Sequence, residues 1–127
     1  MIMYIDSSFY NKLQELHAVK FNWRTNCCGT FVGKMLEHIY QKDFLSEFRD
    51  KLKDEKTNSL LITSKGGWHN ILTSAGFVKR NDRTMYVGDV VISENAIGIY
   101  DGTKGLFAGG SFRNKGRITG CYYHTEK

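Results

Sequence analysis

The 127-residue sequence contains no proline, and it has no apolar run near the about 20 residues that a membrane-spanning helix needs. Residues 1–10 lack the basic region followed by an apolar stretch that marks a secretory signal. No segment repeats, and none is of low complexity. We therefore predict a chain without a signal peptide or a membrane span, whose turns come from glycine, asparagine and aspartate.

Cysteine is also scarce, with three residues at Cys27, Cys28 and Cys121. An odd number of cysteines cannot all pair, and two of these are adjacent, which argues against a disulfide framework. Reduced thiols and synthesis in a reducing cytoplasm follow as expectations. The length fits a single domain over residues 1–127.

Acidic residues are outnumbered by basic ones, giving a formal net charge of +5. Such a balance favours polyanionic partners such as nucleic acid, teichoic acid or an acidic protein face, without choosing among them. Most basic residues are interspersed with acidic ones, as on a solvated helix. Only the C-terminal part is locally basic, through Lys104, Arg113, Lys115 and Arg117.

The N-terminal half has helical periodicity. Ser7 or Ser8 is expected to cap a helix that ends near Lys20, and Thr25 or Asn26 to cap a second helix. The second helix carries an apolar stripe made of Phe31, Val32, Met35, Leu36 and Ile39. A third helix is expected after Asp43, including Leu52, and two short helices within residues 58–65 and 68–76.

From Phe77 onward the pattern changes to short apolar runs separated by turn signals. The candidate strands are "FVKR", "MYVGDVVIS", "AIGIY", "GLFAG" and "RITGCYY". Helices followed by strands predict an α+β domain, in which N-terminal helices pack on a C-terminal antiparallel sheet. Short connections favour strands that are neighbours in both sequence and space.

The adjacent cysteines stand where the second helix begins. A thiol at a helix N-terminus lies beside unpaired backbone N–H groups and the positive end of the helix dipole, which favour the thiolate. Cys27 has that position, and the small Gly29 after it would let a substrate approach. Cys28 points about 100° further around the helix, and we expect it to be structural.

Two motifs resemble a known family. The stretch "NCCGTFV" (residues 26–32) is similar to the "DCSGFV" nucleophile motif of NlpC-type cell-wall peptidases, a papain-like superfamily. The stretch "GDVVISENAIGIYDG" (residues 88–102) is similar to that family's "GDLVFF…HVGIYIG" strand pair. Together with "FNW" and "GGWHNILTSAGF", these motifs look like a small phage-encoded branch of unknown function, and the resemblance covers about residues 21–109.

The resemblance implies a catalytic set that this sequence fills only in part. It places the nucleophile at Cys27, the preceding aspartate at Asn26, and the turn before the central strand at Gly88 and Asp89. The family's histidine base falls on Ala96. The third polar residue falls near Phe107 or Ala108, and neither can orient an imidazole.

Four histidines could in principle replace the missing base. His38 is too far along the thiol helix from Cys27, whereas the sequence does not fix the positions of His17, His69 and His124. A metal site from the three cysteines and His124 is disfavoured, because adjacent cysteines lack the usual spacing of zinc ligands. The glycine-rich segments "DGTKG" and "AGGSF" lack phosphate-loop spacing, so no cofactor is expected.

Three functions follow as hypotheses. The resemblance implies a structural protein of a phage tail tip or baseplate, located in the virion after synthesis in the host cytoplasm, and bound to other tail proteins, to the cell wall or to further copies of itself. The first alternative is an active cysteine hydrolase that cuts peptidoglycan. The second, suggested by the basic charge, is a nucleic-acid-binding or host-directed phage factor, although nucleic acid is the less favoured partner.

Overall fold

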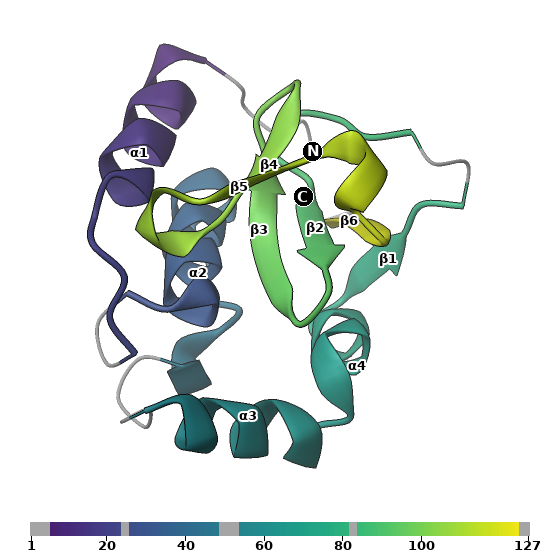
Figure 1. Cartoon of the computed structure of the whole chain (residues 1–127). Coiled ribbons are helices and arrows are strands. Elements are labelled where there is room, and N and C mark those ends of the chain that lie inside the picture. Colours follow the sequence, from purple (N-terminus) through teal and green to yellow (C-terminus); the bar gives the residue numbers. More distant parts are fainter. Residues whose placement is uncertain (1–5, 24–25, 49–53, 82–83, 125–127) are drawn as a thin grey trace.

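A computed structural model of the chain describes residues 6–23, 26–48, 54–81 and 84–124. Within these ranges, α-helices precede a six-stranded antiparallel sheet, which confirms the α+β class (Figure 1). The helices are α1 (Ser7–His17), α2 (Cys28–Tyr40), α3 (Glu55–Ser64) and α4 (Gly67–Ser74). The strands are β1 (Phe77–Lys79), β2 (Val90–Ser93), β3 (Ala96–Tyr100), β4 (Lys104–Leu106), β5 (Phe112–Asn114) and β6 (Gly120–His124). Three 3-10 turns are η1 (Ser46–Phe48), η2 (Ala108–Gly110) and η3 (Lys115–Arg117).

The strand order is β1-β6-β2-β3-β4-β5, and every pair is antiparallel. From β2 to β5 the strands are sequential neighbours, as short connections predict. The exception is β6, which returns from the far edge and inserts between β1 and β2. The last strand of the described chain therefore completes the sheet.

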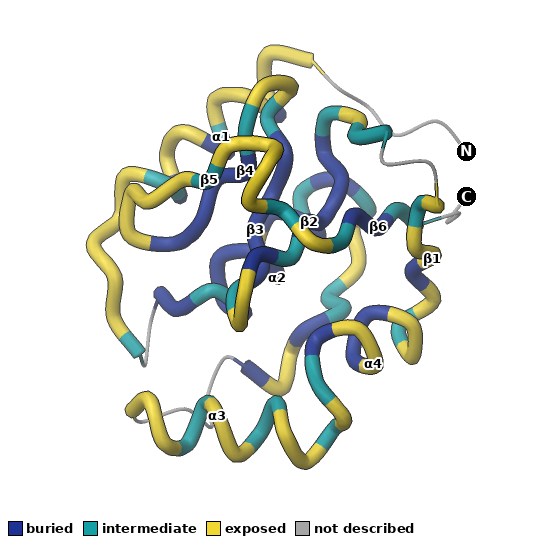
Figure 2. The backbone as a smooth tube through the Cα atoms, turned by 45° about the vertical axis from the view of Figure 1, so that its right-hand side comes forward, coloured by how far each residue is buried: buried dark blue, intermediate teal, exposed yellow. Residues whose placement is uncertain are grey.

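The main core lies between the helices and one face of the sheet. In Figure 1, α1 and α2 lie beside the sheet, while α3 and α4 lie at the end where the β2–β3 hairpin turns. Phe31, Met35 and Leu36 of α2 are fully buried, and α2 packs on β3 as its apolar stripe predicts. Figure 2 shows α3 with only half-buried and exposed residues, in contrast to the buried strands.

Some helix ends and lengths differ from the sequence expectation. The cap of α1 is Asp6, whose carboxylate accepts hydrogen bonds from the backbone N–H groups of Ser8 and Phe9. The helix expected after Asp43 is reduced to η1, and Leu52 lies outside the described residues. No helix among the described residues is long and apolar enough to cross a membrane.

The second half of the sheet also differs in detail. Residues 85–89, expected as part of a strand, form a turn before β2. Residues 107–109, expected at the end of a strand, leave the sheet in η2. Strand β5 was not expected, because its residues read as a turn. It pairs with β4, with Leu106 opposite Phe112.

A buried ion pair holds three strands together. The Asp89 side chain is 1% exposed, and it accepts hydrogen bonds from Arg80 Nε (2.7 Å) and Nη2 (3.1 Å). It also accepts from the backbone N–H of Tyr86 (3.0 Å) and from the Cys121 thiol (3.1 Å). Arg80 follows β1, Asp89 precedes β2, and Cys121 lies in β6, so one carboxylate joins all three strands.

We predict that Asp89→Asn lowers the free energy of unfolding by about 1–3 kcal/mol, because it removes the counter-charge of the half-buried Arg80 guanidinium and places an amide N–H among buried donors. The matched control is Glu94→Gln, which removes the exposed ion pair with Arg117 and should cost less than about 1 kcal/mol. Urea denaturation measures both. Equal losses in the two variants would show that the Asp89 network is not a main support of the sheet.

Candidate functional site

The helix that carries the adjacent cysteines begins one residue later than the motif suggests. Cys27 is the N-cap residue of α2, and Cys28 is the first helical residue. The Asn26 amide donates hydrogen bonds to the carbonyls of Val19 and Lys20 instead of capping the helix. Asn26 therefore fixes the preceding loop against the start of α2.

Cys27 is completely buried. Its exposed fraction is 0%, and its sulfur lies 3.4 Å from the Thr30 hydroxyl, which donates to the Phe48 carbonyl. The thiol is thus directed into the main core and away from solvent. A substrate would have to displace core side chains to reach it.

Cys28 is only half-buried and faces the sheet. The backbone N–H groups of Ile97 in β3 and Ala108 in η2 lie close enough to its sulfur to favour the thiolate. The β3–β4 ladder pairs Ile99 with Leu106, and both contacts with the thiol lie two residues beyond that pair. The thiol therefore occupies the opening where β3 and the chain after β4 separate.

The environment of Cys28 does not produce a thiolate. Burial raises the pKa of the Cys28 thiol, and the adjacent Cys27 adds to this effect. The N–H groups of Ile97 and Ala108 and the positive charge of Arg113 act in the opposite direction, but the net shift is upward. The thiol form of Cys28 is therefore favoured at neutral pH.

The predicted base and orienting positions adjoin in sequence the residues near this thiol, but the side chains of Ala96 and Phe107 pack with Val91 and Tyr100 on the other face of the sheet. Ala96 directly precedes Ile97 in β3, and Phe107 directly precedes Ala108. The structure thus brings together the thiol-bearing helix and the two segments that the family motif marks. The thiol near these segments is that of Cys28, whereas the Cys27 side chain is buried in the main core.

The ring of each of the four histidines makes a contact away from the thiols. The partners are the Ser111 carbonyl for His17 (2.9 Å), the Ser8 hydroxyl for His38 (3.4 Å), the Tyr122 hydroxyl for His69 (2.5 Å) and the Ala75 carbonyl for His124 (3.1 Å). His17 also lies near Phe31, with ring centroids 6.3 Å apart. Among the described contacts, none joins a histidine to Cys27 or Cys28.

Gly29 makes room for an aromatic ring of the protein itself. A Cβ at this position would lie 2.7 Å from the Phe48 ring, so only glycine allows η1 to pack against the start of α2. Phe48 in turn stacks on Trp68, with ring centroids 5.0 Å apart. The space that the motif suggested for substrate is filled by the core.

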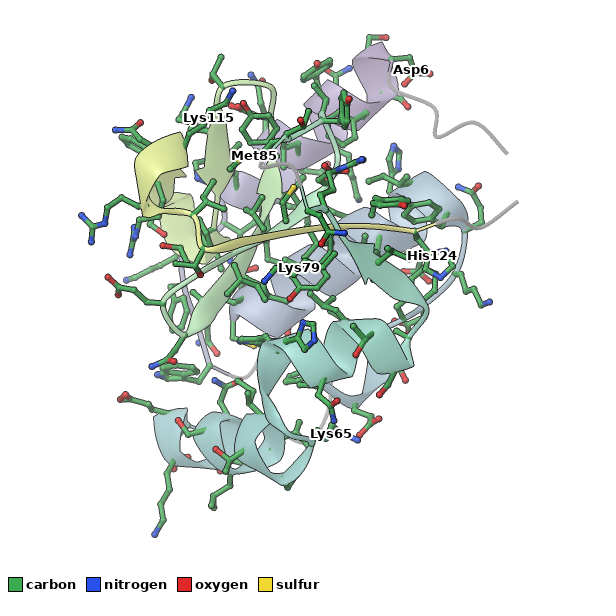
Figure 3. All side chains as sticks on the ribbon, turned by 90° about the vertical axis from the view of Figure 1, so that its right-hand side faces the viewer. Asp6, Lys65, Lys79, Met85, Lys115 and His124 are labelled. Atoms are coloured by element: carbon green, nitrogen blue, oxygen red, sulfur yellow. The ribbon has the colours of Figure 1, made fainter. Side chains whose placement is uncertain are left out.

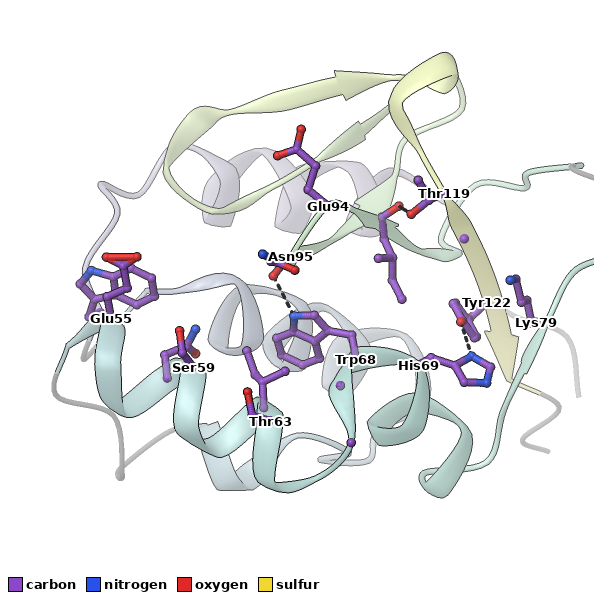
Figure 4. Close-up of a pocket in the computed structure, with 17 residues that line it drawn as sticks. Glu55, Ser59, Thr63, Trp68, His69, Lys79, Glu94, Asn95, Thr119 and Tyr122 are labelled. Atoms are coloured by element: carbon purple, nitrogen blue, oxygen red, sulfur yellow. Dashed lines mark hydrogen bonds between the residues drawn. The ribbon is translucent and has the colours of Figure 1, made fainter.

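A cleft of about 680 Å³ opens beside Trp68, between α3, α4 and the β2–β3 turn (Figure 4). The Trp68 indole N–H donates to the Asn95 carbonyl (3.1 Å) and holds the turn against α4. The Asn58 side-chain oxygen is buried here without a hydrogen-bond partner. Cys28 does not line this cleft, so the cleft is separate from the thiol.

The residues considered for a metal site are dispersed. Cys121 donates to Asp89, and His124 packs among the rings of Tyr40, Phe44 and Phe77. In the part of the chain that the structure describes, no three histidine, cysteine or acidic side chains are placed to hold a metal ion.

One sequence signal does point to Cys28. It precedes Phe31 by three residues and Met35 by seven, so it lies on the same apolar stripe that faces the sheet. Motif alignment alone favoured Cys27, whereas helix geometry places Cys28 against β3.

These features define an α+β domain in which a helix bearing a cysteine at its first turn packs on an antiparallel sheet. The chain belongs to the family described as "Domain of unknown function (DUF6950)", whose family model matches residues 5–120. No curated protein and no solved structure matches the chain.

We predict that iodoacetamide at about pH 8 modifies Cys28 first and leaves Cys27 and Cys121 protected until the protein unfolds. Cys27 is protected by burial, and burial together with the hydrogen bond to Asp89 raises the pKa of Cys121 to about 12. Mass spectrometry of a labelling time course follows each site. The predicted order would be wrong if the fast phase of labelling disappeared in Cys27→Ser and remained in Cys28→Ser.

Proposed function

We propose that this chain is a non-hydrolytic domain of NlpC-like fold that serves as a structural component of a phage tail tip or baseplate. One observation carries the proposal. The thiol that faces the sheet lies near Ile97 and Ala108, which have no titratable side chain, and Ala96, at the expected base position, has none either and packs with Val91 and Tyr100 on the other face of the sheet.

Nucleophilic catalysis by a cysteine needs a group that takes up its proton and later returns it, and a partner that orients that group. The contacts of the four histidines lie elsewhere, and the pKa of the Cys28 thiol is raised by burial. Both features favour a structural role in assembly over a catalytic role in hydrolysis.

The motif resemblance supports the NlpC-like part of the proposal. The two matched segments, at the start of α2 and along β2–β3, meet in space next to the Cys28 thiol. The tail-tip location rests on the phage-encoded branch that the motifs resemble. Other tail proteins, and further copies of this chain within the virion, are the proposed partners, with the cell wall as a possible contact during infection.

An active cysteine hydrolase is the alternative. It draws on the position of Cys28 at a helix N-terminus, with the backbone N–H groups of Ile97 and Ala108 near its sulfur acting to lower its pKa. These donors favour a thiolate, but without a base they do not transfer a proton to a leaving group.

The purified protein should leave peptidoglycan and its stem peptides uncut, because general acid–base catalysis, worth about 10²–10⁴ in rate, has no group to perform it. Chromatography of soluble muropeptides measures this. Ala96→His alone should restore little, since the side chain at this position packs on the face of the sheet that points away from the Cys28 thiol. Fragment release by the unmodified protein that is abolished by Cys28→Ser or Cys27→Ser would establish the hydrolase instead.

The assembly role has its own test. Virions of the encoding phage, purified on a density gradient, should contain the chain at a constant number of copies per particle, measured by quantitative mass spectrometry. Absence from intact particles, with the protein present only in the infected-cell lysate, would refute the tail role and favour a host-directed factor.

A further inference from the structure

The sheet face that points away from the helices carries a second recess, of about 730 Å³. Its floor is the segment 118–121, and its walls are η3 on one side and residues 79–81 with Met85 on the other. Figure 3 looks onto this side of the molecule, with Lys79, Met85 and Lys115 around β6. The volume is within the range of small-molecule sites.

The charged side chains that line the recess are all basic. They are Lys79, Arg80 and Lys115, and no acidic residue is among the described residues that line it. The two neighbouring cations outside the recess are compensated, since Arg117 pairs with Glu94 (3.1 Å) and Lys104 with Asp101 (3.3 Å). Lys79 and Lys115 have no ion pair among the described residues, so the part of the lining that the structure describes carries an uncompensated positive charge.

Arg80 differs from the two lysines because it is fixed in place. Its guanidinium lies between the rings of Tyr86 and Tyr123, 4.3 Å from each centroid, and two of its nitrogens donate to Asp89. Asp89 neutralises its charge through Nε and Nη2, and the remaining nitrogen Nη1 makes no hydrogen bond to that carboxylate in the described structure. A rigid donor next to two flexible ammonium groups is a combination suited to phosphate oxygens.

The remaining lining adds polar and apolar contacts. Asn81 is exposed at the rim, and the half-buried Met85 and Ile118 present apolar surface. At Gly116 an added Cβ would meet nothing within 4 Å, so the mouth beside η3 is open. A ligand with an anionic group and an apolar part would match this lining.

We propose that the recess between β1, β6 and η3 binds a phosphate-bearing anion. Lys79 and Lys115 supply the charge, Arg80 supplies a fixed donor, and Met85 with Ile118 contacts the apolar part. The phosphate could belong to a small molecule or to a nucleic-acid backbone, because both present the same chemistry to this site. The proposal is independent of the thiol and of the tail role.

Isothermal titration calorimetry with pyrophosphate, ATP and a single-stranded oligothymidylate tests the proposal. We expect saturable binding of at least one probe, weakened about tenfold or more in Lys79→Ala/Lys115→Ala. The control Lys34→Ala/Lys56→Ala loses the same charge at exposed positions outside the recess and should bind like the unmodified protein. Binding of pyrophosphate or ATP identifies a small-molecule phosphate, and binding of the oligonucleotide alone identifies a nucleic-acid backbone.

Two variants at Gly116 test the same recess without substituting a lysine. Gly116→Glu places a negative charge at the open mouth and should weaken binding, whereas Gly116→Gln, of equal size, should not. If the oligonucleotide binds through two phosphates, its association constant should fall about sevenfold between about 50 and 200 mM salt.

Three results would overturn the proposal. The first is that no phosphate probe binds. The second is equal weakening in the Lys34→Ala/Lys56→Ala control. The third is that a polyglutamate peptide binds as tightly as the phosphate probes, which would identify an acidic protein surface as the partner.

Discussion

The sheet depends on one buried carboxylate. The Asp89 side chain is buried just before β2 begins. A buried negative charge is stable only if hydrogen-bond donors surround it. Arg80, Cys121 and the backbone N–H of Tyr86 are those donors, and they come from three separate parts of the chain. The backbone N–H of Arg80 also donates to the Cys121 carbonyl, which extends the β1–β6 pairing. To satisfy Asp89, β6 must lie between β1 and β2, so this interaction and the strand order support each other.

The two faces of the sheet have different chemistry because neighbouring residues of a strand point to opposite sides. Val90, Ile97 and Ile99 contact the helices, and with them the thiol-bearing start of α2. Val91 and Tyr100 belong to the smaller cluster on the other face. Among the described residues, the loop after β1 and η3 lie over that second face, and the basic recess lies between them. The thiol and the basic recess are therefore separated by the sheet, and a change in one need not alter the other.

The sequence predicted the α+β class, the buried stripe of α2 and the β2–β3 hairpin, because each follows from a local pattern of apolar residues. It did not predict β5, whose three residues lie between glycine-rich turns and become a strand only by pairing with β4. The helix after Asp43 is replaced by η1, where Phe48 packs against Gly29 and Trp68. In both cases contacts with distant residues determined the conformation, and a local pattern contains no information about them.

For the candidate site, the sequence by itself determined that two thiols stand at the start of a helix and that alanine occupies the position at which the resemblance to NlpC-type peptidases leads one to expect a base. The tertiary structure decided which thiol faces the sheet. Adjacent helical residues point about 100° apart, so the rotation of α2 about its axis selects Cys28 and buries Cys27. That rotation is set by the packing of Phe31, Met35 and Leu36 on β3. The basic recess also depends on the tertiary structure, because β6 pairs with β1 and so places η3 beside the end of β1. The residues on the two sides of the recess are about 35 positions apart in the sequence.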